Sequence, residues 1–132
     1  MKHLGNCKPR EFMQQCVKLR GPFTAWLEKT GIPEIRARKP EGFDAMSDEE
    51  KAEAIRVQGS ENMGEILAAA LEKDFDGTVD VLALCCFTEP DKIDEHPMAE
   101  YLRAVLEMFN DEAVRAFFTL YLRPRREISS GA

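Results

Sequence analysis

The side chains of this sequence most capable of chemistry are two histidines and four cysteines. They are His3, Cys7, Cys16, Cys85, Cys86 and His96. Their spacings are H-x3-C-x8-C, a vicinal C-C pair and one isolated histidine, and none matches the paired C-x2-C arrangement that holds zinc tetrahedrally. We therefore expect no structural metal, and we interpret the cysteines as small apolar residues of helix faces.

Nucleophilic catalysis finds equally little support in the sequence. A nucleophilic Ser or Cys needs a histidine that a third group holds in place, whereas one histidine lies near the N-terminus and His96 directly precedes Pro97 in a predicted loop. The glycine-rich patterns that bind phosphates, G-x-G-x-x-G and G-x-x-x-x-G-K-[ST], are absent from the sequence. We predict a protein that is not an enzyme and that needs no cofactor.

Charge is distributed unevenly along the chain, whose formal net charge is −6. Residues 1–40 hold nine Lys/Arg and three Glu, residues 41–112 hold five Lys/Arg and twenty Asp/Glu, and residues 113–132 hold four Arg and one Glu. Basic ends are compatible with nucleic acid, but no helix-turn-helix, zinc-finger or aromatic-interleaved basic pattern accompanies them. We expect the ends to neutralise the acidic middle, within one chain or between subunits.

The composition fits a single globular domain. The chain has 132 residues, of which 44% are hydrophobic and 32% charged, and a chain of this size can bury one core without help from disulfides or metals. It contains no run of 18 apolar residues and no signal peptide, and its cysteines are too few for a secreted disulfide scaffold. We expect a protein of the cytoplasm that does not bind membranes.

Apolar residues recur with the helical period between Pro and Gly residues, which predicts an all-α fold: a compact single-domain bundle of five to seven helices. The expected helices begin at Pro9, Pro22, Ser47, Thr78, Pro97 and Glu112, with stops at Gly21, Gly31, Asp74, Phe87, Phe109 and Leu122. The segment 78–87 also fits a buried strand, but a lone strand would have no partner. The helical domain should span residues 1–123, and residues 124–132 should form a flexible C-terminal tail.

Two helices have well-marked apolar stripes. The longer helix starts at a capping box formed by Ser47 and Glu50, and its two internal glycines suggest a kink or a close helix crossing. Its stripe consists of Ile55, Gly59, Met63, Ile66, Leu67, Ala70 and Leu71. The stripe of the helix that follows Pro97 consists of Met98, Tyr101, Leu102, Val105, Leu106 and Phe109.

The last helix is the candidate partner-binding element, because it is apolar on most of its sides although it lies next to a chain terminus. Its candidate contact residues are Phe117, Phe118, Tyr121 and Leu122. An amphipathic helix of a partner would lie in a groove between this helix and the helix 98–109, and self-association is the alternative occupant. The competing interpretation is that these residues close the core against the helix 98–109.

Three stretches of the sequence resemble tail assembly chaperones, small proteins encoded in the tail-gene region of prophages of Gram-positive bacteria. The stretches are KHLGNCKPREF (residues 2–12), VLALCCFTEP (81–90) and DEAVRAFF (111–118). The resemblance implies an all-helical protein that binds the tape measure protein in the bacterial host cytoplasm, keeps it soluble and helps the tail tube protein to polymerise around it. It further implies that the protein is not part of the mature virion; members of the family often also have a longer form made by ribosomal frameshifting.

Two other classes of function stay open at this point. One is a small helical nucleic-acid-associated or regulatory adaptor that uses its basic ends, and the other is a small enzyme. Binding to nucleic acid weakens steeply with salt, whereas docking of a helix into an apolar groove largely survives salt. The salt dependence of binding therefore separates the adaptor from the chaperone.

Overall fold

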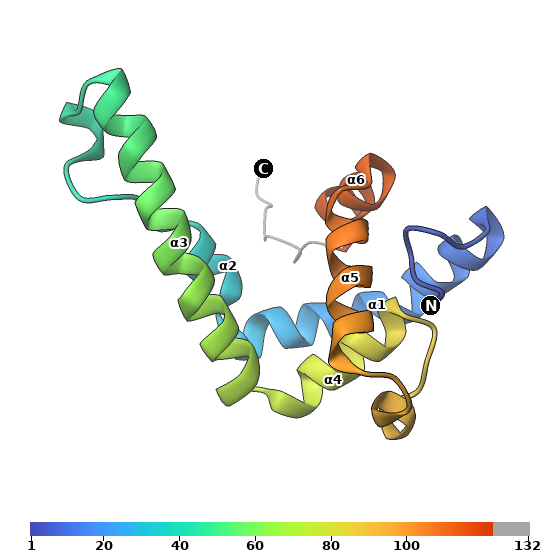
Figure 1. Cartoon of the computed structure of the whole chain (residues 1–132). Helices are drawn as coiled ribbons and strands as arrows, with labels where there is room; N and C mark the ends of the chain where they lie inside the picture. Colours follow the sequence, from blue (N-terminus) through green and yellow to red (C-terminus); the bar gives the residue numbers. More distant parts are fainter. Residues whose placement is uncertain (123–132) are drawn as a thin grey trace, which may run out of the picture. The chain divides into compact units, whose positions relative to one another are not determined.

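The computed structural model describes residues 1–122, and within them it contains six α-helices, two short 3-10 helices and no strand. The all-α prediction of five to seven helices is thereby confirmed. The elements, shown in Figure 1, are α1 (Pro9–Thr30), α2 (Ile32–Arg36), η1 (Phe43–Ala45), α3 (Asp48–Glu72), α4 (Phe75–Cys85), η2 (Pro90–Glu95), α5 (Met98–Phe109) and α6 (Glu112–Leu120). The predicted tail, residues 124–132, lies outside the described residues.

The contacts divide the chain into two compact units. The first unit comprises Met1–Trp26 together with the described residues from Asp76 onward, and the second comprises Leu27–Phe75. The first therefore contains most of α1 with α4, α5 and α6, while the second contains the last turn of α1 with α2 and α3. Apolar spacing and the positions of Pro and Gly did not indicate this division.

Helix α1 does not stop at Gly21, contrary to the sequence prediction, but runs through Pro22 without a break. A proline inside a helix lacks one backbone donor and disfavours the α conformation of the residue before it, partly through that residue's Cβ. Here the preceding residue is a glycine, which has no Cβ. The buried residues Cys16, Leu19 and Phe23 keep helical spacing across the two positions, so packing on both sides holds the helix together.

The segment that also fitted a strand is helical, because α4 runs from Phe75 to Cys85. Its C-terminal carbonyl groups are satisfied by the N-terminal part of the chain. The Leu4 amide donates to the carbonyl oxygen of Cys85 at 3.1 Å, and Nε2 of Gln15 donates to that of Leu84 at 2.6 Å. The first residues of the chain thus cap a helix of the core.

The capping box of α3 is present as predicted. Oγ of Ser47 accepts a hydrogen bond from the Glu50 amide at 3.2 Å, and Oε1 of Glu50 accepts one from the Ser47 amide at 2.9 Å. The preceding stop at Gly31 is also confirmed, since this residue has a φ of 72°, a left-handed conformation that glycine adopts without strain.

Replacing Ser47 by Ala is expected to destabilise the second unit by about 1 kcal/mol, because the Glu50 amide loses its acceptor. Hydrogen exchange of the first amides of α3 measures this loss as faster local opening. Ser60→Ala is the control, since Ser60 is exposed in the middle of the same helix; equal effects of the two substitutions would contradict the role of the cap.

The large residues of the predicted apolar stripe of α3 are mostly exposed, and Ala70 is its one buried member among the described residues. Ile55, Met63, Leu67 and Leu71 are each more than half exposed, whereas the buried residues of α3 are Asn62, Ala69 and Ala70. The reason is the size of the neighbour: α2 has five residues, buries only Ile32 and Ile35, and packs against α3. Small side chains such as those of Ala69 and Ala70 let such a short helix lie close.

Neither internal glycine of α3 marks a close helix crossing. A Cβ added to Gly59 or to Gly64 would meet no atom within 4 Å. The space beside both glycines is open in the described structure, so this part of the prediction is wrong.

The predicted stripe of α5 is also only partly buried. The buried residues of α5 are Tyr101, Ala104 and Met108, of which only Tyr101 belongs to the expected stripe. Tyr101 sets this orientation, because its ring packs with Cys86 in a core cluster and its hydroxyl donates to the carbonyl oxygen of Ile93 at 2.8 Å. The stronger apolar stripe of α5 is consequently turned toward solvent.

Candidate functional site

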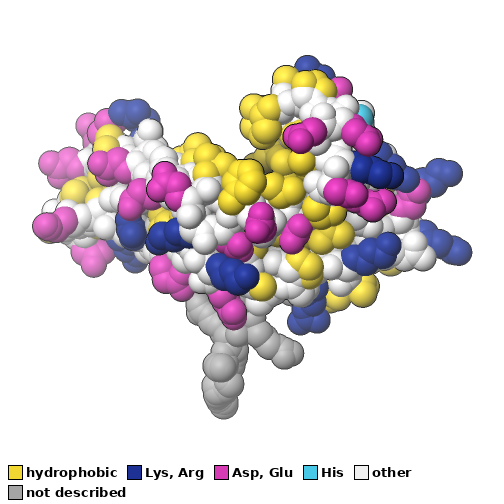
Figure 2. All heavy atoms as spheres, turned by 90° about the horizontal axis from the view of Figure 1, so that it is seen from below, with side chains coloured by type: hydrophobic (Ala, Val, Ile, Leu, Met, Phe, Trp, Pro, Cys, Tyr) yellow, Lys and Arg dark blue, Asp and Glu magenta, His cyan; other side chains and the backbone are white. Residues whose placement is uncertain are grey.

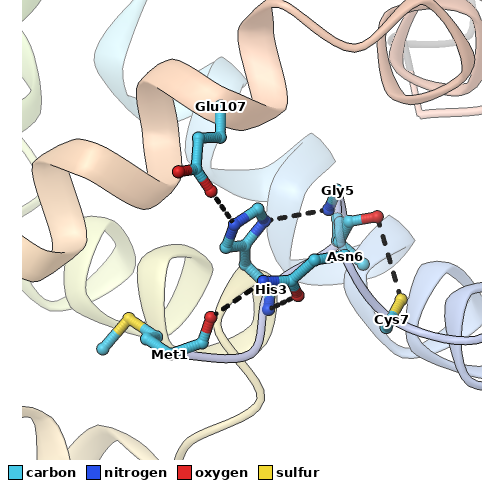
Figure 3. Close-up of polar contacts among 7 residues, drawn as sticks. Met1, His3, Gly5, Asn6, Cys7 and Glu107 are labelled. Carbon is cyan, nitrogen blue, oxygen red and sulfur yellow. Dashed lines mark hydrogen bonds and ion pairs between the residues drawn. The ribbon is translucent and has the colours of Figure 1, made fainter.

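The histidine at position 3 lies in a closed network of hydrogen bonds between the N-terminal segment and α5 (Figure 3). His3 is 2% exposed. Its Nδ1 accepts a hydrogen bond from the Gly5 amide at 2.9 Å, and its Nε2 lies 2.7 Å from Oε1 of Glu107. Its own amide donates to Oδ1 of Asn6 at 2.8 Å. A backbone amide can only donate, so Nδ1 is unprotonated and Nε2 carries the proton that Glu107 accepts.

This network excludes His3 as a general base within the described structure. A general base needs a free lone pair within reach of the proton that it removes, and the only lone pair of this ring already accepts from the Gly5 amide. A Cβ on Gly5 would lie 3.0 Å from the ring, so glycine is the residue that permits this close approach. The role of His3 is structural: it ties the first residues of the chain to α5.

Three of the four cysteines are buried thiols of the core. Cys16, Cys85 and Cys86 are buried, and Cys7 is partly exposed with its Sγ 3.8 Å from the Leu4 carbonyl oxygen. Burial raises the pKa of the Cys16 and Cys86 thiols to about 11 and that of Cys85 further still. Thiols with such pKa values stay protonated at neutral pH, which makes them poor nucleophiles and poor metal ligands.

The other histidine, His96, lies beside a glutamate of α5. Nδ1 of His96 lies 2.9 Å from Oε1 of Glu100, one turn away on the exposed start of α5. No group of three or more His, Cys, Asp or Glu residues in the described part of the chain is arranged to hold a metal ion.

Labelling with a thiol reagent at pH 8 should modify Cys7 first and leave Cys16 and Cys86 unmodified in the folded protein. A rise in pKa from 9.0 to about 11 lowers the thiolate fraction at this pH about a hundredfold, and burial slows the reaction further. Mass spectrometry after timed quenching identifies the modified positions. The urea-unfolded protein, in which all four thiols should react, is the control; rapid labelling of native Cys86 would contradict this assignment.

Two aromatic residues of α6 form ring contacts with α1. Phe117 meets Phe12 edge to face with ring centroids 4.7 Å apart, and Phe118 meets Phe23 in the same way at 5.2 Å. Edge-to-face pairs of this kind add to the energy of burial. Helix α6 also contacts α5, so these residues help to close a core with both helices, while Phe117 keeps 37% of its surface exposed.

The end of α6 is held more tightly still. The Arg20 guanidinium lies 4.7 Å from the ring centroid of Tyr121, and Leu122 is completely buried. Leu122 therefore belongs to the core and has no surface to offer a partner, which removes it from the candidate contact residues. Leu120 is the residue of this helix most open to solvent, with 79% of its surface exposed.

An uncovered apolar surface lies on α5. We define the α5 face as Met98, Leu102, Leu106 and Phe109, which are each more than half exposed. The spacing i, i+4, i+8, i+11 places all four on one side of the helix over three turns. Helix α5 ends at Phe109, and Asp111 caps the helix that follows: its Oδ1 accepts a hydrogen bond from the Val114 amide at 3.0 Å. Figure 2 shows apolar side chains reaching the surface among charged ones on the side that it draws.

The predicted apolar stripe of the helix 98–109 contains all four residues of the α5 face together with the buried Tyr101. A signal of a second apolar side is Ala104, which with Met108 extends the apolar surface of α5 beyond the predicted stripe. A short helix with two apolar sides in a small domain cannot bury both against few neighbours.

No helix in the described part of the chain is long and apolar enough to cross a membrane. Comparisons of the chain with protein-family models, with curated proteins and with solved structures found no match.

Proposed function

We propose that this protein is a tail assembly chaperone of a long-tailed phage or prophage, which binds helical segments of the tape measure protein in the host cytoplasm. It acts by binding rather than by catalysis, and assists polymerisation of the tail tube protein without remaining in the mature virion. The observation that carries the proposal is the α5 face, four large apolar side chains in a row that the described structure leaves in solvent. The three sequence stretches named above supply the family.

The α5 face suits a helical partner for a geometric reason. Its four residues form a narrow stripe along three turns, and an amphipathic helix presents a matching stripe with anchors at i, i+3, i+4 and i+7. An isolated helix of a tape measure protein exposes such stripes before the tube encloses it. Covering them during assembly would keep the long chain from aggregating.

The adaptor that binds nucleic acid through basic ends receives less support from the described residues. Lys2 pairs with Glu11 and lies over the Phe87 ring, and the Arg20 guanidinium lies over Tyr121. These cations thus already have partners within the protein. A strong decrease of partner binding with salt would favour the adaptor nevertheless.

Gene neighbourhood and co-expression test the proposal together. A gene for the tail tube protein should lie upstream, and a very long gene for a predominantly helical protein should lie downstream. Fragments of that helical protein should become soluble when they are co-expressed with this protein. Fragments that remain insoluble, or a neighbourhood without tail genes, would contradict the proposed function.

A further inference from the structure

The second unit has its own uncovered apolar surface, on α3. We define the α3 face as Val57, Met63, Leu67 and Leu71, together with the small residues between them, Ser60, Gly64 and Ala68. All seven are exposed and none is charged. Their spacing places them on one side of the helix, while α2 packs against α3, whose buried residues are Asn62, Ala69 and Ala70.

The side chains of Ser60, Gly64 and Ala68 are short, so another helix can approach the backbone of α3 closely on this face. A Cβ on Gly64 would meet nothing within 4 Å, and the distance between two packed helices falls as the side chains at the contact become smaller. Each glycine inside a helix costs about 1 kcal/mol relative to alanine. No turn, positive φ or close neighbour at Gly64 accounts for that cost in the described structure.

The charges around the face determine which helix fits it. α3 contains seven acidic residues and two basic ones, Lys51 and Arg56. Both basic residues already interact with side chains of the same unit. Arg56 forms an ion pair with Glu53, and the Lys51 ammonium lies 5.3 Å from the ring centroid of Phe43. The surface of α3 is therefore strongly acidic beside its apolar face.

Two of the acidic residues lie along the edge of the α3 face. Glu61 is one turn from Val57 and from Gly64, and Glu72 is one turn from Ala68. Both glutamates are exposed, and neither forms an ion pair among the described residues. They are available to cationic side chains of a partner.

We propose that the α3 face is the docking site of a basic amphipathic helix from a partner protein. The apolar side of that helix covers Met63, Leu67 and Leu71, and its flanking Lys or Arg residues reach Glu61 and Glu72. A second copy of α3 fits less well, because it would bring two acidic helices together in either orientation. This site goes beyond the proposed function, since it lies on the other unit and selects its partner by charge.

Fluorescence anisotropy with two synthetic peptides tests the proposal on the full chain. One peptide is an amphipathic helix of Leu, Ala and Lys, and the other has Glu at every Lys position. The basic peptide should bind at least about tenfold more tightly than the acidic one. Leu67→Asp should weaken its binding at least about tenfold, and Glu61→Lys combined with Glu72→Lys should both weaken binding and reduce its salt dependence.

Val17→Asp on α1 is the matched control, because Val17 is an exposed apolar residue outside both the α3 face and the α5 face, and this variant should bind the basic peptide as the wild-type protein does. If the proposed function is wrong, the basic peptide should still bind to the α3 face. The two proposals can therefore be contradicted independently of each other. Because Leu67 is more than half exposed, Leu67→Asp should keep its helical content in circular dichroism; if it does not, Leu67→Gln takes its place.

Three results would overturn the proposal. The first is a basic peptide that does not bind, or that binds no better than the acidic one. The second is binding that Leu67→Asp leaves intact. The third is a wild-type dimer, detected by light scattering, that Leu67→Asp dissociates, since a second copy would then cover the face.

Discussion

Replacing Leu122 by Ala is expected to lower the free energy of unfolding by about 2–5 kcal/mol, the range for truncating a large aliphatic side chain in a core. Leu122 has no exposed surface although it follows the last helix. Its amide donates to the Phe117 carbonyl oxygen at 3.1 Å, which ends α6 and turns the side chain inward. Chemical denaturation followed by circular dichroism measures the loss.

Leu120→Ala is the matched control for this prediction, because the same side chain two positions earlier is 79% exposed. A surface substitution of this kind changes the free energy of unfolding by no more than about 0.5 kcal/mol. Similar losses at the two positions would mean that burial at the end of α6 does not hold in solution. The pair therefore tests which part of the last helix is core and which is surface.

The helices themselves could be predicted from the sequence because their signals are local. Ser47 and Glu50 form a capping box within one turn, and Gly31 supplies the left-handed residue between α1 and α2. Neither signal depends on what the helix packs against. The exception at Gly21 has a tertiary cause, since buried residues before and after Pro22 hold α1 together.

Which side of each helix is buried could not be predicted in the same way. The hydrophobic period of α5 marks Tyr101, Leu102 and Leu106 alike. Of these three only Tyr101 is buried, through its contact with Cys86 and its hydrogen bond to the Ile93 carbonyl oxygen. In α3 the small residues Ala69 and Ala70 are buried instead of the large ones. Burial depends on neighbours distant in sequence, and a stripe of large residues is compatible with core and with a binding face alike.

Helix α6 shows the same ambiguity between core and binding surface. Phe118 was expected to contact a partner, yet its ring packs on Phe23, more than ninety positions earlier in the chain. Periodicity assigns aromatic residues to one side of a helix but does not identify their partner. Leu122 is buried and leaves the candidate contact surface, whereas the contact role of Phe117, Phe118 and Tyr121 stays a prediction beside that of the α5 face.

Replacing both Leu102 and Leu106 by Asp should weaken binding of a soluble tape measure fragment at least about 30-fold, while the urea midpoint of unfolding stays within the error of measurement. Anchors at the centre of an interface commonly contribute 2 kcal/mol or more each, and a carboxylate placed against an apolar helix also loses its hydration. Both leucines are more than half exposed in the free protein, which is why stability should not change. Titration calorimetry measures the affinity.

Val17→Asp is the control, because Val17 is an exposed apolar residue of α1, in the same unit but outside the α5 face. It places the same charge on the surface and should leave the affinity unchanged. A double variant that binds normally would remove the α5 face from the proposed mechanism, and a control that loses binding equally would show that added negative charge alone is responsible. Loss of binding in the double variant only, with unchanged unfolding, identifies α5 as the helix that holds the partner.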